Sequence, residues 1–490
     1  MKREIILGPP GTGKTRELVQ RLQEAFDRGI PPEEIAYLAF TKKAADVAIQ
    51  RSMQHFGFQR SRFPYFRTIH SLAFHENKIT SQSVMRHENY KELGELFGWD
   101  FQASYENFEE RPNYGAGLGD QLLRCYDLAK AKGVSPQVEA RSGDYPFGEF
   151  AIEHFVNQFE SYKTRNGLYT FNDFLERPID LELRLVIVDE AQDLTHLQWH
   201  FLRESFRKVE QILIAGDDDQ CIYQWSGADL NFFLKIDAQI TNLRHSFRCR
   251  ENIWKMCNRV SSKIAKRYPK EWEPVDKGGD VIVQRDPHGV DLSKGEWLVL
   301  VRKNRALRAY FNVLMQTGRI FHDGYAWINE KTWFKGALAY MRLESGHPIS
   351  AQEAMALLKV TSHATKKIEL VQFFWEDFIW QWSDEVPKGY HPNWDYACDK
   401  LDFEHVAFIR KCKENGEDIF SPGQIRLSTV HAAKGGEADN VLLDMKLDGI
   451  PLKQFRKDPD SERRVWYVGI SRARNKLVLS GAVKNAAVDI

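Results

Sequence analysis

The chain of 490 residues is too long for one hydrophobic core and predicts two to four domains. Its 43% hydrophobic and 28% charged residues are typical of a soluble globular protein. The 68 basic and 68 acidic residues cancel, which excludes a chain-wide positive field but leaves room for a local basic groove.

Cysteine spacing and the pattern of apolar residues predict a cytoplasmic setting. The six cysteines form neither a C-x-x-C pair nor a zinc-ligand spacing, so we expect reduced thiols. The N-terminus lacks the long apolar run of a signal peptide, and no stretch reaches the roughly 18 apolar residues of a membrane span. We therefore predict a cytoplasmic protein without membrane association.

The first functional element in the chain is a phosphate-binding loop. Residues 4–7 form a short apolar strand, and residues 16–26 have helical periodicity. The turn between them fits G-x-x-x-x-G-K-[ST] at every fixed position and comprises Gly8, Pro9, Pro10, Gly11, Thr12, Gly13, Lys14 and Thr15. Its glycines let backbone N–H groups surround a phosphate at the helix N-terminus. Lys14 would neutralise the β- and γ-phosphates of a nucleotide, and the Thr15 hydroxyl would ligate Mg²⁺.

A pair of acidic residues follows a strongly apolar strand in the middle of the chain. Residues 185–188, LVIV, form a run expected of a strand buried on both faces, and Asp189 and Glu190 come directly after it. The carboxyl end of a parallel strand faces the crevice where ligands bind. We therefore assign Asp189 to Mg²⁺ and Glu190 to polarising the water that attacks the γ-phosphate.

The segment GDDDQCIYQWSGAD, residues 216–229, contains three adjacent aspartates. Three carboxylates can form a metal site, but Mg²⁺ already has Thr15 and Asp189. We expect Asp217–Asp219 to shape a turn after a strand at residues 211–215, through side-chain bonds to backbone N–H groups.

Further apolar, β-rich runs alternate with helical segments along the chain. They cover residues 35–40, 211–215, 280–283, 297–301, 425–429, 441–444 and 477–480. The alternation predicts an α/β fold with doubly wound parallel sheets, and the number of strands requires two such domains. The expected domains are residues 1–74 and 169–273 with a mainly helical insertion at 75–168, and residues 274–343 and 424–490 with a shorter insertion at 344–423.

Two arginines outside the first motifs can act on a nucleotide phosphate. HSFR ends at Arg248, and YVGISRAR near the C-terminus contains Arg472. An arginine contributed across a domain cleft can stabilise negative charge on a transferred phosphoryl group. If both guanidinium groups face the γ-phosphate, closure of the cleft would be coupled to hydrolysis. Either arginine alone is more often a surface residue, so the prediction depends on the combination.

Nine stretches of the sequence resemble, in order, the motifs of superfamily 1 helicases of the UvrD/Rep/PcrA type. They are GPPGTGKTR (8–16), LAFTKKAADVA (38–48), FRTIHSLAF (66–74), TFNDFL (170–175), VIVDEAQDLTHLQ (186–198), ILIAGDDDQCIYQWSGAD (212–229), LRHSFRCRENI (243–253), STVHAAKGGEADNVLL (428–443) and ERRVWYVGISRARNKL (462–477). Nine matches in the same order are far more specific than any single motif.

The resemblance implies ATP and Mg²⁺ as cofactors, two RecA-like domains, and 3′-to-5′ movement along single-stranded DNA. Implied contacts to the nucleotide come from Gln220 at the γ-phosphate, Arg248 and Arg472 as finger residues, Arg16 and Tyr223 on either side of the adenine, and Glu437 at the ribose. Implied DNA contacts come from Phe40, Thr41, His70, Trp225, Thr429 and His431, of which the last two would also link DNA to the ATP site.

The sequence therefore predicts an ATP-dependent DNA helicase, a monomeric motor on single-stranded DNA and on its junctions with duplex DNA. Replication or repair proteins of a bacterial or phage-infected cell are its expected protein partners. A translocase that remodels protein–DNA complexes without efficient strand separation is the alternative. A P-loop phosphotransferase would need no second arginine-bearing domain, and a non-hydrolysing nucleotide switch would not need Glu190. The tryptophan-dense segment at 373–382 is expected to be core.

Overall fold

The computed structural model of the chain describes residues 2–39, 42–102, 115, 117–362 and 393–481. Phe40, Thr41 and the tryptophan-dense segment at 373–382 lie outside the described residues. The chain forms two units, each built from several segments. The first comprises Met1–Arg248, Ser261–Val275 and Gln454–Arg464, and the second comprises Cys249–Val260, Asp276–Lys453 and Val465–Ile490.

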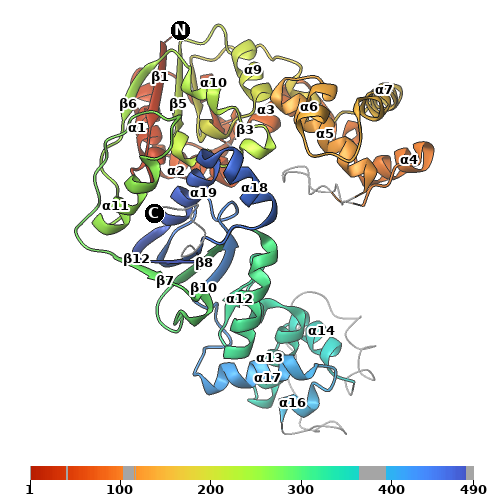
Figure 1. Cartoon of the computed structure of the whole chain (residues 1–490), viewed down its shortest axis with the longest axis vertical. Helices are drawn as coiled ribbons and strands as arrows, with labels where there is room; N and C mark the ends of the chain where they lie inside the picture. Colours follow the sequence, from red (N-terminus) through yellow and green to blue (C-terminus); the bar gives the residue numbers. More distant parts are fainter. Residues whose placement is uncertain (1, 40–41, 103–114, 116, 363–392, 482–490) are drawn as a thin grey trace. The chain divides into compact units, whose positions relative to one another are not determined.

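A six-stranded sheet forms the centre of the first unit, in the order β3-β2-β4-β5-β1-β6 (Figure 1). Its strands are β1 (Lys2–Leu7), β2 (Ile35–Ala39), β3 (Phe66–Thr68), β4 (Leu185–Val188), β5 (Gln211–Gly216) and β6 (Gln239–Asn242). All neighbouring strands in it run parallel. β2 and β4 are apolar and buried along their whole length, as expected of strands covered on both faces.

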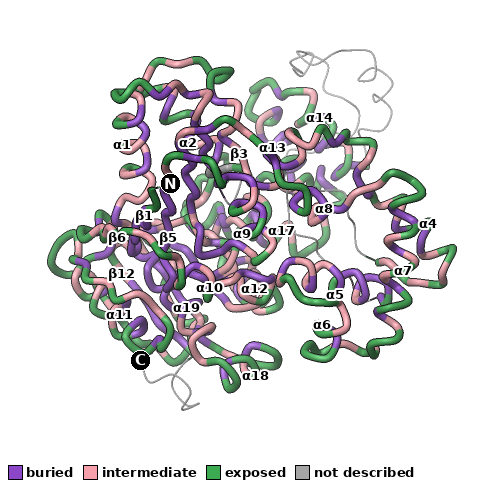
Figure 2. The backbone as a smooth tube through the Cα atoms, turned by 90° about the horizontal axis from the view of Figure 1, so that it is seen from above, coloured by how far each residue is buried: buried purple, intermediate pink, exposed green. Residues whose placement is uncertain are grey.

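Alternate residues of these strands enter two separate hydrophobic cores. Ile5 and Val186 belong to one core, whereas their neighbours Ile6 and Ile187 belong to the other. Since successive side chains point to opposite faces of a strand, packed layers must cover both faces of the sheet. Figure 2 shows buried strands with exposed residues on the surrounding helices and loops. This arrangement confirms the predicted doubly wound fold.

The helices of the first unit fall into two groups. Those next to the sheet are α1 (Lys14–Asp27), α2 (Lys42–Phe56), α3 (Ile69–Glu76), α8 (Phe171–Leu175), α9 (His196–Ser205) and α10 (Leu230–Leu234). The helices α4 (His87–Phe97), α5 (Leu118–Lys132), α6 (Pro136–Ser142) and α7 (Glu149–Asn166) form the insertion around a core of their own (Figure 1). This insertion contacts α8 through two ion pairs, in which Nζ of Lys130 and Nζ of Lys163 lie 2.6 and 2.8 Å from carboxylate oxygens of Asp173.

The second unit contains another six-stranded parallel sheet, in the order β7-β12-β11-β8-β10-β9. Its strands are β7 (Asp280–Gln284), β8 (Trp297–Val301), β9 (Phe321–His322), β10 (Ile425–Thr429), β11 (Ala438–Asp444) and β12 (Ala473–Ser480). Its helices are α11 (Glu251–Ser261), α12 (Asn304–Thr317), α13 (Thr332–Glu344), α14 (Ala351–Val360), α16 (Trp394–Ala397) and α17 (Phe403–Glu414), and α18 (Gly449–Lys457) and α19 (Pro459–Ile470) contribute residues to both units. Two parallel-sheet units confirm the predicted fold class.

The differences from the expected elements are local. The strands β3 and β9 were not predicted because they have only three and two residues, and β6 was not predicted because its sequence, QITN, is largely polar. β11 and β12 begin three and four residues before their predicted starts, since their first residues are polar or small. Among the helices that the structure describes, none combines the length and apolar character needed to cross a bilayer.

Candidate nucleotide-binding site

The loop between β1 and α1 has the backbone that its glycines allow. Gly11 and Gly13 adopt φ values of 71° and 83°, in the left-handed region that favours glycine. At Gly8 a Cβ atom would lie 2.1 Å from Cγ of Lys14, so the lysine side chain passes directly over that glycine. Lys14 Nζ donates to the Gly8 carbonyl at 3.0 Å, and its charge therefore lies at the mouth of the loop.

The acidic pair lies at the carboxyl end of β4, as predicted, and faces Lys14. The carboxylate of Asp189 accepts hydrogen bonds from the Tyr37 hydroxyl and from the Glu190 backbone N–H, both at 2.9 Å. Burial raises the pKa of Asp189 to about 6, and the neighbouring charge of Glu190 acts in the same direction. One oxygen of Glu190 lies 3.7 Å from Lys14 Nζ.

Glu190 has a backbone conformation that few residues with a side chain adopt. Its φ of 53° lies in the left-handed region, which is disfavoured for any residue with a Cβ atom. The side chain is held by Gln192, whose Nε2 donates to Glu190 Oε2 at 2.6 Å. The structure thus maintains a strained backbone and a fixed carboxylate at the residue assigned to water activation.

The donor atoms near the loop suit a hard divalent cation. The Thr15 hydroxyl and the Asp189 carboxylate are oxygen donors of the kind that Mg²⁺ accepts, and Mg²⁺ commonly binds one or two carboxylates together with nucleotide phosphates and water. The described residues contain no separate cluster of three or more metal-ligating side chains. The residues present therefore fit a cation that is bound together with a nucleotide.

The three aspartates after β5 are neither a metal cage nor a solvated turn. Asp217, Asp218 and Asp219 are each 0% exposed and contact Lys270 Nζ at 2.7, 2.5 and 2.9 Å. Arg267 adds a second ion pair to Asp219, at 2.7 Å. One predicted turn contact is present, because Asp217 accepts from the Asp219 backbone N–H at 3.2 Å. The aspartates are mainly ion-pair partners of a lysine about 50 residues later, which no local pattern reveals.

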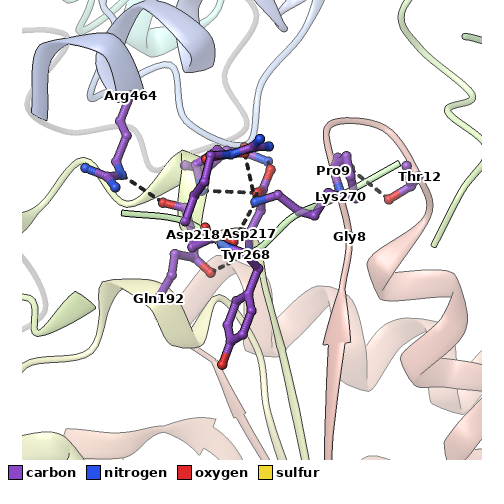
Figure 3. A network of polar contacts seen from close by, with 12 residues as sticks. Gly8, Pro9, Thr12, Gln192, Asp217, Asp218, Tyr268, Lys270 and Arg464 are labelled. Carbon is purple, nitrogen blue, oxygen red and sulfur yellow. Dashed lines mark hydrogen bonds and ion pairs between the residues drawn. The ribbon is translucent and has the colours of Figure 1, made fainter. Parts of the chain in front are cut away.

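Gln220 lies within this buried network. Its Nε2 donates to Asp217 Oδ2 at 2.7 Å, and the side chain belongs to the short 3₁₀ helix η5 (Asp218–Gln220). The backbone N–H of Asp217 donates to Gln192 Oε1 at 3.0 Å. The residues assigned to phosphate sensing and to water activation are therefore connected by hydrogen bonds within the first unit. Figure 3 shows Asp217, Gln192 and Lys270 of this network.

The HSFR segment packs against the phosphate-binding loop. Ser246 Oγ donates to the Pro10 carbonyl at 2.9 Å, and the Phe247 backbone N–H donates to the Gly11 carbonyl at 2.8 Å. A Cβ atom on Gly11 would lie 2.5 Å from Cβ of Arg248. The structure thus brings Arg248 next to the loop, as the sequence suggested.

An aromatic residue that sequence reasoning did not select lies beside the loop. A Cβ atom on Gly13 would be 3.5 Å from the Phe247 ring and 3.8 Å from Cβ of Arg16. The Phe247 side chain is 63% exposed. Tyr223 instead lies near Trp225, with ring centroids 6.5 Å apart, and packs on the core of the first unit. Phe247 and Arg16 therefore both lie beside Gly13 of the loop.

The predicted DNA contacts of the first unit are described for two residues. Trp225 is 49% exposed, which a core tryptophan would not be. His70 is partly buried, and its ring makes an edge contact with Phe171 at 5.9 Å.

Four predicted site residues lie in the second unit, next to the strands β10, β11 and β12. Thr429 is the last residue of β10, and its Oγ1 accepts from the Ala432 backbone N–H at 3.2 Å. His431 lies in the same turn, two residues after Thr429. Glu437 precedes β11 and forms an ion pair with Arg474 at 3.0 Å. Arg472 is 2% exposed and donates to the carbonyls of Val468 and Gly436, at 3.0 and 3.1 Å.

A basic pocket in the second unit was missed by the sequence reasoning. It has a volume of about 570 Å³ and is lined at one end by Arg302, Lys303 and Arg305, directly after the buried strand β8. Further cationic lining residues are Arg285 and Lys446, and the acidic ones are Asp444 and Asp448. A strongly apolar strand followed by RKNR is a signal that could have identified it.

Comparison with known proteins places this arrangement in a family. The chain matches a family model described as the UvrD/REP helicase N-terminal domain over residues 2–241, and one described as the UvrD-like helicase C-terminal domain over residues 401–484. It is 23% identical to the ATP-dependent DNA helicase PcrA of Leuconostoc citreum, over 98% of this chain and 80% of that protein. It is 24% identical to the ATP-dependent DNA helicase UvrD2 of Mycobacterium tuberculosis (98% and 77%) and 23% identical to DNA helicase II of Haemophilus influenzae (98% and 82%). The chain therefore belongs to the UvrD/Rep helicase family.

Proposed function

We propose that the chain is an ATP-dependent DNA helicase that moves 3′ to 5′ along single-stranded DNA. The observation that carries the proposal is the joining of Lys14, Glu190 and Gln220 around one phosphate-binding loop. Two of the relatives are ATP-dependent DNA helicases by name and the third is a DNA helicase by name, which supports the same activity here. The direction of movement rests on the motif resemblance and is tested by the choice of DNA substrate below.

Within the proposed cycle each residue has a definite task. Lys14 would neutralise phosphate charge, and Thr15 and Asp189 would hold Mg²⁺, which supplies charge neutralisation on the phosphate oxygens. Glu190 would orient the attacking water and accept its proton. Arg248 would stabilise the charge that develops on the γ-phosphate.

The second unit would contribute Arg472 as the other finger residue. Its guanidinium group now donates to carbonyl oxygens of its own unit, so it would exchange at least one of these bonds for a phosphate oxygen. Such an exchange would make hydrolysis depend on the conformation of the second unit. Glu437 would contact the ribose only after loosening its ion pair with Arg474.

We infer that the adenine stacks on Phe247 rather than on Tyr223. Phe247 lies beside Gly13 and Arg16, and its side chain is 63% exposed. A planar base enclosed by a phenyl ring and a guanidinium group gains stacking and cation–π energy. Tyr223 and Trp225 would then both serve the DNA side of the segment that also contains Gln220.

Replacing Trp225 with alanine should lower DNA-stimulated ATP hydrolysis more than basal hydrolysis. Stacking of one base on an aromatic side chain contributes about 1–3 kcal/mol, so the DNA concentration for half-maximal stimulation should rise at least about fivefold. Steady-state ATPase assays with and without oligo(dT) measure both rates. Tyr396→Ala, which removes a ring that is 62% exposed in the second unit, is the control. An equal loss of basal and stimulated rates would identify Trp225 as a structural residue.

The proposed activity requires that single-stranded DNA stimulate ATP hydrolysis and that unwinding depend on the tail of the duplex. Purified chain should separate a duplex that carries a 3′ single-stranded tail and leave a duplex with a 5′ tail intact. Equal ATP turnover with and without DNA would contradict the motor. Stimulated turnover without strand separation, together with displacement of a protein bound to the DNA, would favour the translocase alternative. Sedimentation of the chain on the same DNA tests the monomeric state.

Two further parts of the proposal concern the setting of the protein. All six cysteines are buried thiols, which supports a reducing cytoplasm.

The basic pocket beside β8 would contact phosphates of the DNA backbone, because such contacts are independent of sequence and depend on lysine and arginine. Junctions between single-stranded and duplex DNA would be the preferred substrates, with replication or repair proteins as partners.

A further inference from the structure

Asp217 lies where three segments of the first unit meet, namely its own turn and those of Gln192 and Lys270 (Figure 3). Its Oδ2 accepts from Gln220 Nε2 at 2.7 Å, and its Oδ1 accepts from Lys270 Nζ at 2.7 Å. Its backbone N–H donates to Gln192 Oε1 at 3.0 Å. Asp217 and Gln192 are 0% exposed and Gln220 is 4% exposed, so water does not compete for these bonds.

The ionised state of Asp217 determines how the Gln220 amide is turned. Although burial acts in the opposite direction, the charge of Lys270 lowers the pKa of Asp217 below its ordinary value. An ionised carboxylate only accepts hydrogen bonds, so the amide nitrogen of Gln220 must face it. The amide oxygen of Gln220 is consequently directed away from Asp217.

The same residue acts on Glu190 through Gln192. Gln192 uses its oxygen to accept from the backbone N–H of Asp217 and its nitrogen to donate to Glu190 at 2.6 Å, so neither end of this amide can turn without breaking a buried bond. Gln220 is thus bonded directly to Asp217, and Glu190 is connected to Asp217 by two hydrogen bonds through Gln192.

Lys270 keeps the carboxylate in place. Its side chain is 1% exposed, and its ammonium group contacts all three adjacent aspartates. A buried charge is stable only when it is paired, so the ammonium group fixes both the charge and the position of Asp217. Tyr268 and Arg464 hold the next residue, since the Asp218 side-chain Oδ2 accepts from the Tyr268 N–H and the Asp218 backbone carbonyl accepts from Arg464.

We propose that Asp217, held by Lys270, is a positioning residue that aims Gln220 at the γ-phosphate and, through Gln192, fixes Glu190. The inference rests on the proposed function, since it assigns Asp217 a task within ATP hydrolysis. Asp217 does not itself touch the nucleotide in this scheme. It sets the orientation of two residues that do, or that hold the attacking water.

Asp217→Asn keeps the size of the side chain and places a donor where the network needs an acceptor. The kcat of DNA-stimulated ATP hydrolysis should fall about 10- to 100-fold, because misplacing a catalytic group by about 1 Å can have an effect of that order. The KM for ATP should stay within about threefold, since Lys14 and the loop are unchanged. Arg267→Met is the matched control, because it removes an ion pair to Asp219 without touching Asp217 and should leave kcat within about twofold.

A double-mutant cycle separates positioning from a general loss of structure. In a Gln220→Ala background, adding Asp217→Asn should change kcat by less than about threefold, because its main target is already absent. Multiplicative losses in the double variant would overturn the inference. Asp217→Glu, which keeps the charge and moves the carboxylate by one methylene, replaces the asparagine variant if that variant does not fold. A wild-type kcat in Asp217→Glu would also overturn the inference.

The outcome for the wild-type chain separates this inference from the proposed function. Wild-type protein without DNA-stimulated turnover would overturn both. Active wild-type protein together with wild-type kcat in Asp217→Asn would overturn the role of Asp217 alone. Loss of kcat in Asp217→Asn with retained KM, an unaffected Arg267→Met control and a non-additive double variant is the result expected.

Discussion

Glu190→Gln is expected to lower ATP turnover by about 100-fold or more while ATP still binds. The amide has the size of the carboxylate but cannot accept a proton from the attacking water. Lys14, which lies 3.7 Å from Glu190, keeps its place over Gly8 and remains available to the phosphates. Single-turnover hydrolysis and equilibrium binding of a fluorescent ATP analogue measure the two effects separately.

The control for this variant is Glu182→Gln, which makes the same change at an exposed position three residues before β4. It should leave both turnover and nucleotide binding unchanged. Glu190→Gln protein that hydrolyses ATP at the wild-type rate would remove Glu190 from water activation. Retained DNA binding by the same variant would show that the chemical step, and not the DNA site, has been affected.

Lys270→Met is expected to lower the free energy of unfolding by about 3–5 kcal/mol, because removing one partner of a buried ion pair leaves the other charge without compensation. Here one ammonium group contacts three carboxylates that are each 0% exposed. Methionine fills nearly the same volume, so the loss would come from charge rather than from a cavity. Urea unfolding followed by circular dichroism measures the change.

Acidification should partly restore the stability of this variant. Burial raises the pKa of Asp218 to about 6, and Lys270 acts against this rise. Without the lysine the pKa would rise further, so the folded variant would bind more protons than its unfolded chain, and its stability would increase as the pH falls from 8 toward 6. Lys266→Met, at an exposed position four residues earlier, is the control and should show neither the loss nor the pH effect. A Lys270→Met variant as stable as this control would mean that the carboxylates take up protons or water at little expense.

The parts of the site that local sequence could predict are those formed by one strand and the turn after it. The loop from Gly8 to Thr15 and the pair Asp189 and Glu190 each follow an apolar strand, and parallel strands place such turns at the same edge of the sheet. The two doubly wound sheets could also be predicted from sequence, because strands and helices alternate along the chain. The short strand β6, QITN, could not be predicted because it is polar and lies at the sheet edge.

The parts that local sequence could not predict depend on contacts between distant residues. Lys270 is 53 residues from Asp217, and Tyr37 is 152 residues from Asp189, yet both hold a carboxylate of the site. Neither residue belongs to a recognisable motif. The sequence assigned adenine stacking to Tyr223, whereas the proposal of Phe247 rests on its position beside Gly13, which only the folded chain reveals.

The segmented make-up of the first unit affects the order in which it can form during synthesis. The buried aspartates gain their ammonium partner only when Lys270 has been synthesised. The guanidinium group of Arg464, which is 1% exposed, bonds to the Asp218 carbonyl although Arg464 comes 246 residues later in the chain. A growing chain that ends near Arg248 would therefore hold three carboxylates without their ammonium partner. The sheet of the first unit would wait for the C-terminal part of the chain before reaching full stability, which makes the intact chain, and not its N-terminal half, the smallest piece expected to fold well.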